Sequence, residues 1–366
     1  MKLSCSRVEL RDALRVVSGV VDPRNIKPIL KDIHIRTVNG LLELSATDLE
    51  VGIKYVVRDV DTEEEGGIVV PADPVSGIVS ESQDERLFLT VNENMLIITG
   101  ATSRFQVMGV SEEEFPEIPD FPEEKSLEIE GAVFSEMIDK TSFAVAVEKQ
   151  RYALNGVLLA AKEKSPRIEL VGTDGRRLAL IRRKANSPSP FDSSAIIPVK
   201  ALLQLRKMLS EEDVARIIVH ERQVLMKNEQ AVLVAQLVEG RFPPYDEVVP
   251  DDCDKKMEVQ GSEFVQAIRQ AAVLSSKATR AVRLSVEKGK ILLDSSDVEA
   301  GEAHVELGAK YDGDPVQIRF NPDYLLDGLK AIGDTVVRME MKDSSRAAVM
   351  RSGTDYLYLL MPITQE

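Results

Sequence analysis

The chain has 366 residues, with 46 Lys or Arg and 61 Asp or Glu, so its formal net charge is −15. Hydrophobic residues make up 43%, which suits two or three folded domains and excludes a disordered or fibrous chain. We expect no membrane span and no secretory signal, because the sequence has no apolar run of the required length. Its two cysteines are too few for a disulfide framework or a Cys-based metal site. The negative net charge disfavours nucleic-acid binding by net charge alone.

One pattern of apolar residues recurs three times along the chain. The copies begin at Leu3, Leu127 and Met257, and each has apolar residues at offsets 0, 2, 7 and 11. The first spacing, of two residues, is typical of a strand, and the later spacing, of four, is typical of one face of a helix. Each copy therefore predicts a strand that runs directly into a helix.

A second strand followed by a helix is expected later in each copy. The strands end at Val69–Pro71, Ile196–Pro198 and Ile318–Pro322. In the last case Asn321 is a suitable N-cap, and the following proline suits the first helical position. Three pairs between alternating strands, Asn39-Gly40, Asn155-Gly156 and Asp174-Gly175, predict tight hairpin turns.

The repeats predict an α+β fold of three similar domains, each with two helices packed on antiparallel sheets. Acidic, proline-rich stretches at 112–124 and 243–255 separate the copies. We therefore expect domains over residues 1–124, 125–254 and 255–366.

Three aspartates, Asp48, Asp174 and Asp297, each follow Ser or Thr at the end of a strand. An aspartate there commonly accepts hydrogen bonds from its own turn, and three separate turns do not make one active site. The sequence also lacks phosphate-binding loops, nucleophile elbows and paired histidines. We expect no catalytic residue, metal or cofactor; the alternative, an enzyme that uses these aspartates, predicts one pocket where the carboxylates converge.

Basic residues follow helical spacing in several predicted helices. Arg7, Arg11 and Arg15 form one stripe, and Lys200, Gln204 and Lys207 form another. Any amphipathic helix places charge outward, so a single stripe says little. Its repetition in several domains favours a basic face.

Several short motifs, in order along the chain, resemble those of bacterial DNA polymerase III β subunits, the β sliding clamps. They are Lys27–Leu30, Ala46–Glu50, Arg151–Gly156, Thr173–Ala179, Leu237–Pro243 and Leu360–Pro362. The resemblance implies the DNA clamp fold and a head-to-tail homodimer that forms a six-domain ring. It also implies a non-catalytic, cytoplasmic processivity factor that encircles duplex DNA after loading by an ATP-dependent clamp loader.

A ring would resolve the conflict with net charge, because topology, not tight binding, would hold the DNA. The expected DNA-facing residues are Arg7, Arg11, Arg15, Arg24, Lys149, Gln150, Lys200, Lys207 and Arg269. By position, the resemblance places the dimer interface at Phe105 and Val107 of one subunit, facing Val273 and Leu274 of the other.

The resemblance further implies a pocket for short peptide motifs of the replicative polymerase, clamp loader, repair polymerases, mismatch-repair proteins and ligase. The matching positions are Leu154, Thr173, Gly175, Arg176, Arg177, Leu178, Pro243, Val248, Ser345, Ala347, Leu360, Met361, Pro362 and Ile363. The chain departs from the family at Arg176, Glu247 and Arg346, and Glu247 would disfavour acidic peptides. A remaining alternative is an accessory paralogue that keeps the fold but does not encircle DNA.

Overall fold

A computed structural model describes residues 1–147, 152–275 and 280–364. The chain forms two compact units. The first unit contains Met1–Ser135, Ala185–Phe191 and Lys200–Leu237, and the second contains Glu136–Lys184, Asp192–Val199 and Val238–Glu366. The middle third of the chain therefore contributes to both units, and the domain boundaries expected at 124 and 254 stay predictions.

The first unit contains two antiparallel sheets. The eight-stranded sheet has the order β10 (Leu127–Glu130), β15 (Val214–Val219), β16 (Gln223–Lys227), β17 (Ala231–Gln236), β4 (Val51–Val57), β3 (Leu41–Thr47), β2 (Asp32–Val38) and β6 (Gly67–Pro71). The five-stranded sheet has the order β5 (Val60–Glu64), β1 (Lys2–Ser6), β7 (Arg86–Asn92), β8 (Met95–Thr99) and β9 (Arg104–Met108).

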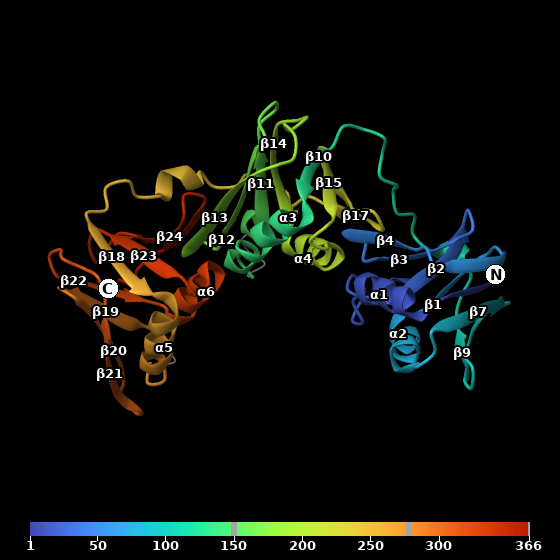
Figure 1. Cartoon of the computed structure of the whole chain (residues 1–366), viewed down its shortest axis with the longest axis horizontal. Helices are drawn as coiled ribbons and strands as arrows, with labels where there is room; N and C mark the ends of the chain where they lie inside the picture. Colours follow the sequence, from blue (N-terminus) through green and yellow to red (C-terminus); the bar gives the residue numbers. More distant parts are fainter. Residues whose placement is uncertain (148–151, 276–279, 365–366) are drawn as a thin grey trace. The chain divides into compact units, whose positions relative to one another are not determined.

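Helices α1 (Arg7–Val17) and α2 (Ala72–Glu81) pack side by side in the first unit (Figure 1). Ser6 caps α1 by accepting a hydrogen bond from the Glu9 N–H at 3.5 Å. The apolar stripe of α1 is buried, as its spacing predicts. Most of α4 (Val199–Met208) also belongs to this unit, and α3 (Gly131–Asp139) begins here and ends in the second unit.

The second unit repeats this arrangement. Its eight-stranded sheet has the order β14 (Ser193–Pro198), β11 (Gly156–Ala161), β12 (Arg167–Thr173), β13 (Arg177–Lys184), β25 (Tyr356–Leu360), β24 (Ala348–Ser352), β23 (Val336–Met341) and β18 (Lys255–Gln260). Its four-stranded sheet has the order β21 (Gly301–Gly308), β20 (Lys290–Asp297), β19 (Val282–Glu287) and β22 (Val316–Phe320). Helices α5 (Gly261–Ala272) and α6 (Pro322–Ile332) pack together, and Asn321 caps α6 as predicted, with its side chain accepting from the Asp323 N–H at 2.9 Å.

The repetition predicted from the sequence is visible where strands from different thirds of the chain pair. β4 pairs with β17 in the first unit, and β13 pairs with β25 in the second. Equivalent backbone hydrogen bonds close the two seams: the Gln236 N–H donates to the Glu50 carbonyl, and the Met361 N–H donates to the Arg176 carbonyl, both at 2.9 Å. Each third also has two helices, which confirms the predicted fold class.

Two of the three predicted hairpin turns are confirmed. Asn39 and Gly40 have φ values of 51° and 76° between β2 and β3, and Gly175 has a φ of 83° between β12 and β13. The hairpin predicted at Asn155–Gly156 is wrong, because these residues lead from the short 3₁₀ segment η4 (Tyr152–Leu154) into β11. A Cβ on Gly156 would lie 2.6 Å from the Ile197 carbonyl oxygen, so this glycine permits close strand approach.

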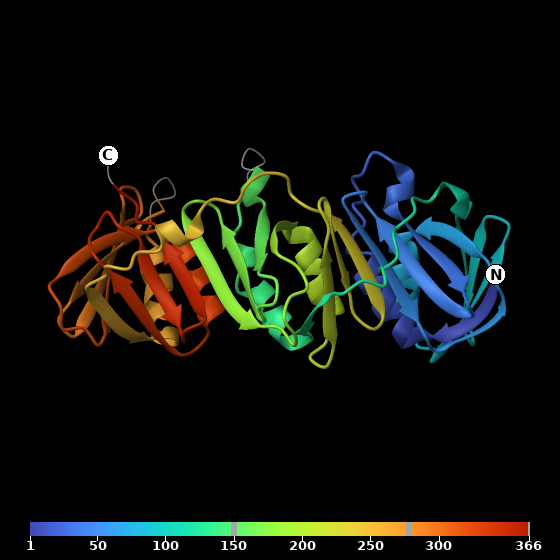
Figure 2. The same cartoon turned by 90° about the horizontal axis from the view of Figure 1, so that it is seen from above.

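Two long connectors pack on the sheets. The first, residues 109–126, crosses the sheet of the first unit (Figure 2), and Ile118 and Phe121 pack against Leu225 and Val234. The second, residues 238–254, packs on the eight-stranded sheet of the second unit through Phe242 and neighbouring apolar residues. None of the described helices is both long and apolar enough to cross a membrane.

Candidate functional site

The three repeated aspartates form three equivalent turns. The Oδ1 atom of each accepts two backbone N–H bonds within its own turn. The donors are Glu50 and Val51 for Asp48 (3.0 and 2.7 Å), Arg176 and Arg177 for Asp174 (2.8 and 3.0 Å), and Glu299 and Ala300 for Asp297 (2.9 and 3.0 Å). The turns belong to separate hairpins, which confirms the structural interpretation. Nowhere in the described part of the chain do His, Cys, Asp and Glu gather as a metal site would need.

The arginine stripe of α1 is only partly free. Arg11 and Arg15 are exposed, and among the described residues Arg11 forms an ion pair only with its half-buried neighbour Asp12, at 3.4 Å. Arg7 is half-buried, and its Nε donates to the Asp84 carbonyl at 2.7 Å. Arg11 and Arg15 are thus free to meet a phosphate, whereas Arg7 mainly fixes the start of the helix.

The residues predicted to form a basic stripe on α4 are partly covered by another segment of the chain. Gln204 is buried, and its Nε2 donates to the Gly19 carbonyl at 2.5 Å. Lys200 is half-buried; its Nζ donates to the Val20 carbonyl at 2.8 Å and pairs with the Asp48 carboxylate. This helix face is covered because it meets the segment that follows α1. Lys200 therefore holds that segment, and a direct DNA contact would require it to leave Asp48.

The remaining predicted DNA-facing residues lie on exposed parts of both units. Arg24 has a side chain 92% exposed, in a loop where its backbone N–H donates to Asp22 Oδ1 at 2.9 Å. That N–H lowers the pKa of the Asp22 carboxyl. Lys207, at the end of α4, and Arg269, on α5, are exposed. Lys149 and Gln150 lie outside the described residues.

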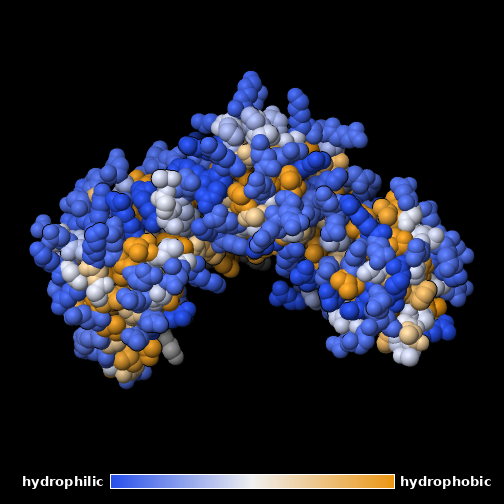
Figure 3. Space-filling model, in the orientation of Figure 1, coloured by the Kyte–Doolittle hydropathy of each residue, from blue (hydrophilic) through white to orange (hydrophobic). Residues whose placement is uncertain are grey.

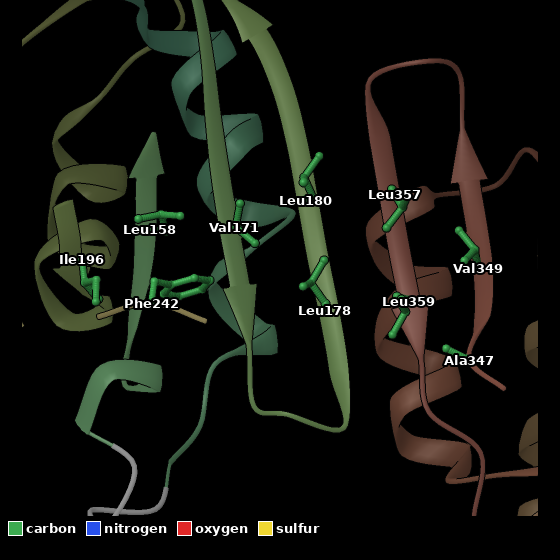
Figure 4. Packing of buried hydrophobic residues seen from close by; sticks show 10 residues of the cluster. All are labelled: Leu158, Val171, Leu178, Leu180, Ile196, Phe242, Ala347, Val349, Leu357 and Leu359. Atoms are coloured by element: carbon green, nitrogen blue, oxygen red, sulfur yellow. The ribbon is translucent and has the colours of Figure 1, made fainter. Parts of the chain in front are cut away.

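The predicted pocket residues gather at the seam between β13 and β25. Leu178 pairs with Leu359 across this seam, and Arg177 pairs with Leu360. Figure 4 shows Leu178 and Leu359 on the same layer as Ala347, where they join one buried apolar cluster. The structure thus brings three distant segments of the prediction together within the second unit.

The surface of this seam is a mixture of buried and exposed positions. Thr173, Leu178, Ala347 and Leu360 are buried; Leu154, Arg177, Pro362 and Ile363 are half-buried; Gly175, Arg176, Pro243, Val248, Ser345 and Met361 are exposed. Val249, not the predicted Val248, packs on the cluster, while Val248 is 53% exposed. Apolar side chains therefore reach the surface beside Leu178, where an apolar peptide anchor could bind.

Arg177 is committed to internal contacts. Its guanidinium donates to Asp174 Oδ2 at 3.0 Å, to Asp327 Oδ2 at 2.6 Å and to the Phe143 carbonyl at 2.8 Å. It also lies 4.3 Å from the ring centre of Tyr324. Burial by itself lowers the pKa of Arg177, but the bond to Asp327 and nearby groups outweigh it and raise that pKa. Arg177 thus orders the turn between β12 and β13, and the sequence did not reveal its partners Asp327 and Phe143 because they are far away in the chain.

The four residues predicted for the dimer interface differ in their exposure to solvent. Phe105 is 40% exposed on β9, the outer strand of the five-stranded sheet, and Val273 is 77% exposed just after α5. Leu274 is half-buried. Val107 is 8% exposed and lies in the core of its own unit, so Phe105 and Val273 are the better candidates for contact with another subunit.

Family models match nearly the whole chain. The N-terminal, central and C-terminal domains of the DNA polymerase III beta subunit match residues 1–119, 128–244 and 246–364. Similar proteins include the beta sliding clamps of Pseudomonas aeruginosa, 31% identical over 99% of this chain and 100% of its own, and Chlamydia pneumoniae, 30% identical over 99% of both chains.

Solved structures give the same result. The P. aeruginosa sliding clamp bound to griselimycin is 30% identical, with a TM-score of 0.94 and complete coverage of both chains. The sliding clamp of Bacillus subtilis is 26% identical, with a TM-score of 0.93 and complete coverage of both chains. The similarity thus extends over the whole length of the fold.

Proposed function

Because this chain belongs to the DNA polymerase III beta subunit family, as a DNA sliding clamp and non-catalytic processivity subunit, we propose that it encircles duplex DNA as a head-to-tail homodimer. In this role it tethers the replicative polymerase and serves the clamp loader, repair polymerases, mismatch-repair proteins and ligase in the cytoplasm. The observation that best supports DNA contact is the pair of exposed arginines on α1, Arg11 and Arg15.

The charge distribution suits a protein that slides. The visible face in Figure 3 is mainly hydrophilic, and the chain as a whole is acidic, with a net charge of −15. Acidic surface repels DNA, whereas a few arginines attract phosphates without reading bases. Because exposed charge pairs are weak and screened by salt, DNA held by topology can move past them.

The seam at Leu178 supports a groove for partner peptides. Met361 is 43% exposed next to the buried Leu360, and Val248 is exposed on the second connector. Flexible Met side chains adapt to different apolar anchors. The related P. aeruginosa clamp binds griselimycin, which supports ligand binding by clamps of this fold.

Retention on nicked circular DNA tests the DNA assignment. We expect the double variant Arg11→Glu, Arg15→Glu to leave the DNA several-fold faster than the unaltered clamp after loading, because two attractive contacts become repulsive. The difference should shrink as salt concentration rises. The measurement is the fraction of clamp that stays with the circle through gel filtration over time.

The control is a double variant at exposed lysines of two loops, Lys125→Glu, Lys164→Glu. It changes the net charge equally but should affect retention less. Sedimentation must show the same oligomeric state for all three proteins. Equal retention by the arginine variant and the control would contradict the assignment of α1 to the DNA-facing surface.

A further inference from the structure

The second unit contains a cavity of about 750 Å³ that none of the predicted site residues line. It lies over one end of the sheet formed by β14, β11, β12 and β13, beside the 3₁₀ segment η5 (Tyr245–Val248) of the second connector. One cross-strand row, Ser194, Ala160, Glu169 and Arg182, lies on its floor. Small side chains at two of these four positions leave the space open.

The acceptor groups of this cavity are largely occupied. Both oxygens of Glu169 accept hydrogen bonds, one from Arg182 Nε at 2.8 Å and one from Tyr245 Oη at 2.9 Å. Asp192 Oδ1 accepts the Glu163 N–H at 2.8 Å. Asp246 Oδ1 lies 3.9 Å from Arg182 Nη2. Glu169 is therefore satisfied, and the exposed carboxylates Asp192 and Asp246 are the acceptors that remain beside the donors of Lys162 and Arg167.

Two lining cations, Lys162 and Arg167, have no ion-pair partner among the described residues. Arg167 also lies directly opposite Lys184 in the pairing of β12 with β13. Like charges opposite each other destabilise a sheet, and here neither cation has a neutralising partner in the described structure. The lining also contains the carboxylates Glu169, Asp192 and Asp246, but Glu169 is paired with Arg182. Lys162 and Arg167 are therefore the positive charges in the cavity that an anionic group could neutralise.

We propose that this cavity binds an acidic side chain that flanks the motif of a partner peptide. The proposal rests on the proposed peptide groove at Leu178, because Leu178 and the cavity residue Arg182 lie on the same strand. Leu178 and Arg182 are four residues apart on β13, which corresponds to about 13 Å at ~3.3 Å per residue. About four or five extended residues span that distance, over the connector that lies between the two places.

The charged residues around the cavity determine where along the partner peptide the acidic residue must lie. Asp246 and Glu247 are exposed on η5, so an acidic residue is disfavoured directly over the connector. In the cavity on the far side of the connector, a carboxylate of the peptide can accept two hydrogen bonds from the Arg167 guanidinium and one from the Lys162 ammonium group. The cavity therefore selects acidic residues at a distance from the apolar anchors and not beside them.

Fluorescence anisotropy at low salt tests this selection on the full-length clamp. The reference probe is a Gln-Leu-Ser-Leu-Phe peptide. Further probes carry a six-residue extension at the N-terminus or at the C-terminus of this peptide. The far end of each extension contains either Glu or, for comparison, Gly and Ser. We expect the Glu extension at one end to bind roughly three- to tenfold more tightly than its Gly-Ser counterpart. The gain should be lost in the variant Lys162→Glu, Arg167→Glu.

The matched control reverses two other exposed lysines, Lys125→Glu and Lys164→Glu. Lys164 belongs to the same turn and is 86% exposed, but it does not line the cavity. The gain should remain in this variant, since only the global charge has changed. Circular dichroism must show that all variants keep the wild-type fold.

Three results would overturn the proposal, each in its own way. Equal binding of Glu-extended and Gly-Ser-extended peptides would disprove the acidic subsite while leaving the peptide groove intact. Absence of binding by every peptide would mean that the proposed groove itself is wrong. Tighter, Arg167-dependent binding of a single-stranded oligonucleotide would assign these cations to nucleic acid.

Discussion

At the scale of single residues, His34 illustrates how burial controls a charge. Its imidazole is nearly buried on β2, and its Nε2 lies 2.7 Å from Glu112 Oε2 on the first connector, with the Phe115 ring 5.0 Å away. Burial lowers the pKa of His34, and the bond to Glu112 opposes that shift only in part; nearby Arg36 lowers the pKa and Glu43 raises it. The neutral imidazole is therefore the form that fits the folded protein.

Acid should weaken the first unit through His34. A lowered pKa means that the unfolded chain binds this proton more readily, so stability is lost as pH falls from about 6.5 toward the folded pKa. Urea unfolding between pH 7.5 and 5 should show a smaller decline in unfolding free energy for His34→Gln than for the unaltered protein. His220→Gln, at a half-exposed histidine near Glu124, is the control, and identical slopes for His34→Gln and the unaltered protein would contradict the argument.

At the scale of elements, two glycines inside helices have opposite surroundings. Gly328 lies in α6, where an added Cβ would come 2.4 Å from ring carbons of Tyr358. Tyr358 is fully buried, and its Oη donates to the Tyr324 carbonyl at 2.9 Å. Gly77 lies in α2, where an added Cβ would meet no atom within 4 Å apart from its chain neighbours and the backbone of its own helix. The first glycine thus permits helix–sheet contact, whereas the second only lowers helix propensity.

The substitution Gly328→Ala should lower the unfolding free energy by about 1–3 kcal/mol, because the new methyl group displaces a packed ring. The same change at Gly77 should be neutral or stabilise the protein by up to ~1 kcal/mol. Chemical denaturation of both variants gives the comparison. Similar effects at the two positions would show that packing on Tyr358 does not restrict α6.

At the scale of the whole molecule, the five-stranded and the four-stranded sheet each have an outer strand that pairs with a described strand on one side only. β9 is the outer strand of the five-stranded sheet, with exposed Arg104 and Phe105, and β21 is the outer strand of the four-stranded sheet, with exposed Glu302 and Glu306. Uncovered strands are prone to pair with other chains. Their opposite charges favour β9 of one subunit against β21 of another, which supports the proposed head-to-tail dimer.

Phe105→Asp should therefore convert the dimer to a monomer of 40.5 kDa, because a carboxylate would be buried at the contact. Phe88→Asp is the control: Phe88 is 54% exposed on β7 in the same sheet, but the strand register places it on the opposite face. Sedimentation equilibrium distinguishes the two species. A dimer that persists in Phe105→Asp and dissociates in Phe88→Asp would place the interface on the other face of the sheet.

The sequence by itself determined the triplicated α+β fold, the helix cap at Asn321, the turn roles of the three aspartates and the family. These features depend on periodic patterns or on hydrogen bonds between neighbouring residues, so each can be predicted from a short segment of the sequence. The clamp motifs likewise consist of contiguous residues.

Only the tertiary structure decided which polar residues are free. Lys200 binds Asp48, 152 residues away, and Arg177 binds Asp327, 150 residues away. Gln204 is buried against Gly19, and the cavity beside Tyr245 needs a connector folded over distant strands. Helical spacing indicates that residues share a face, but which segment covers that face depends on the packing of elements far apart in the chain. That packing leaves Arg11 and Arg15 exposed, whereas Lys200 and Gln204 form internal contacts.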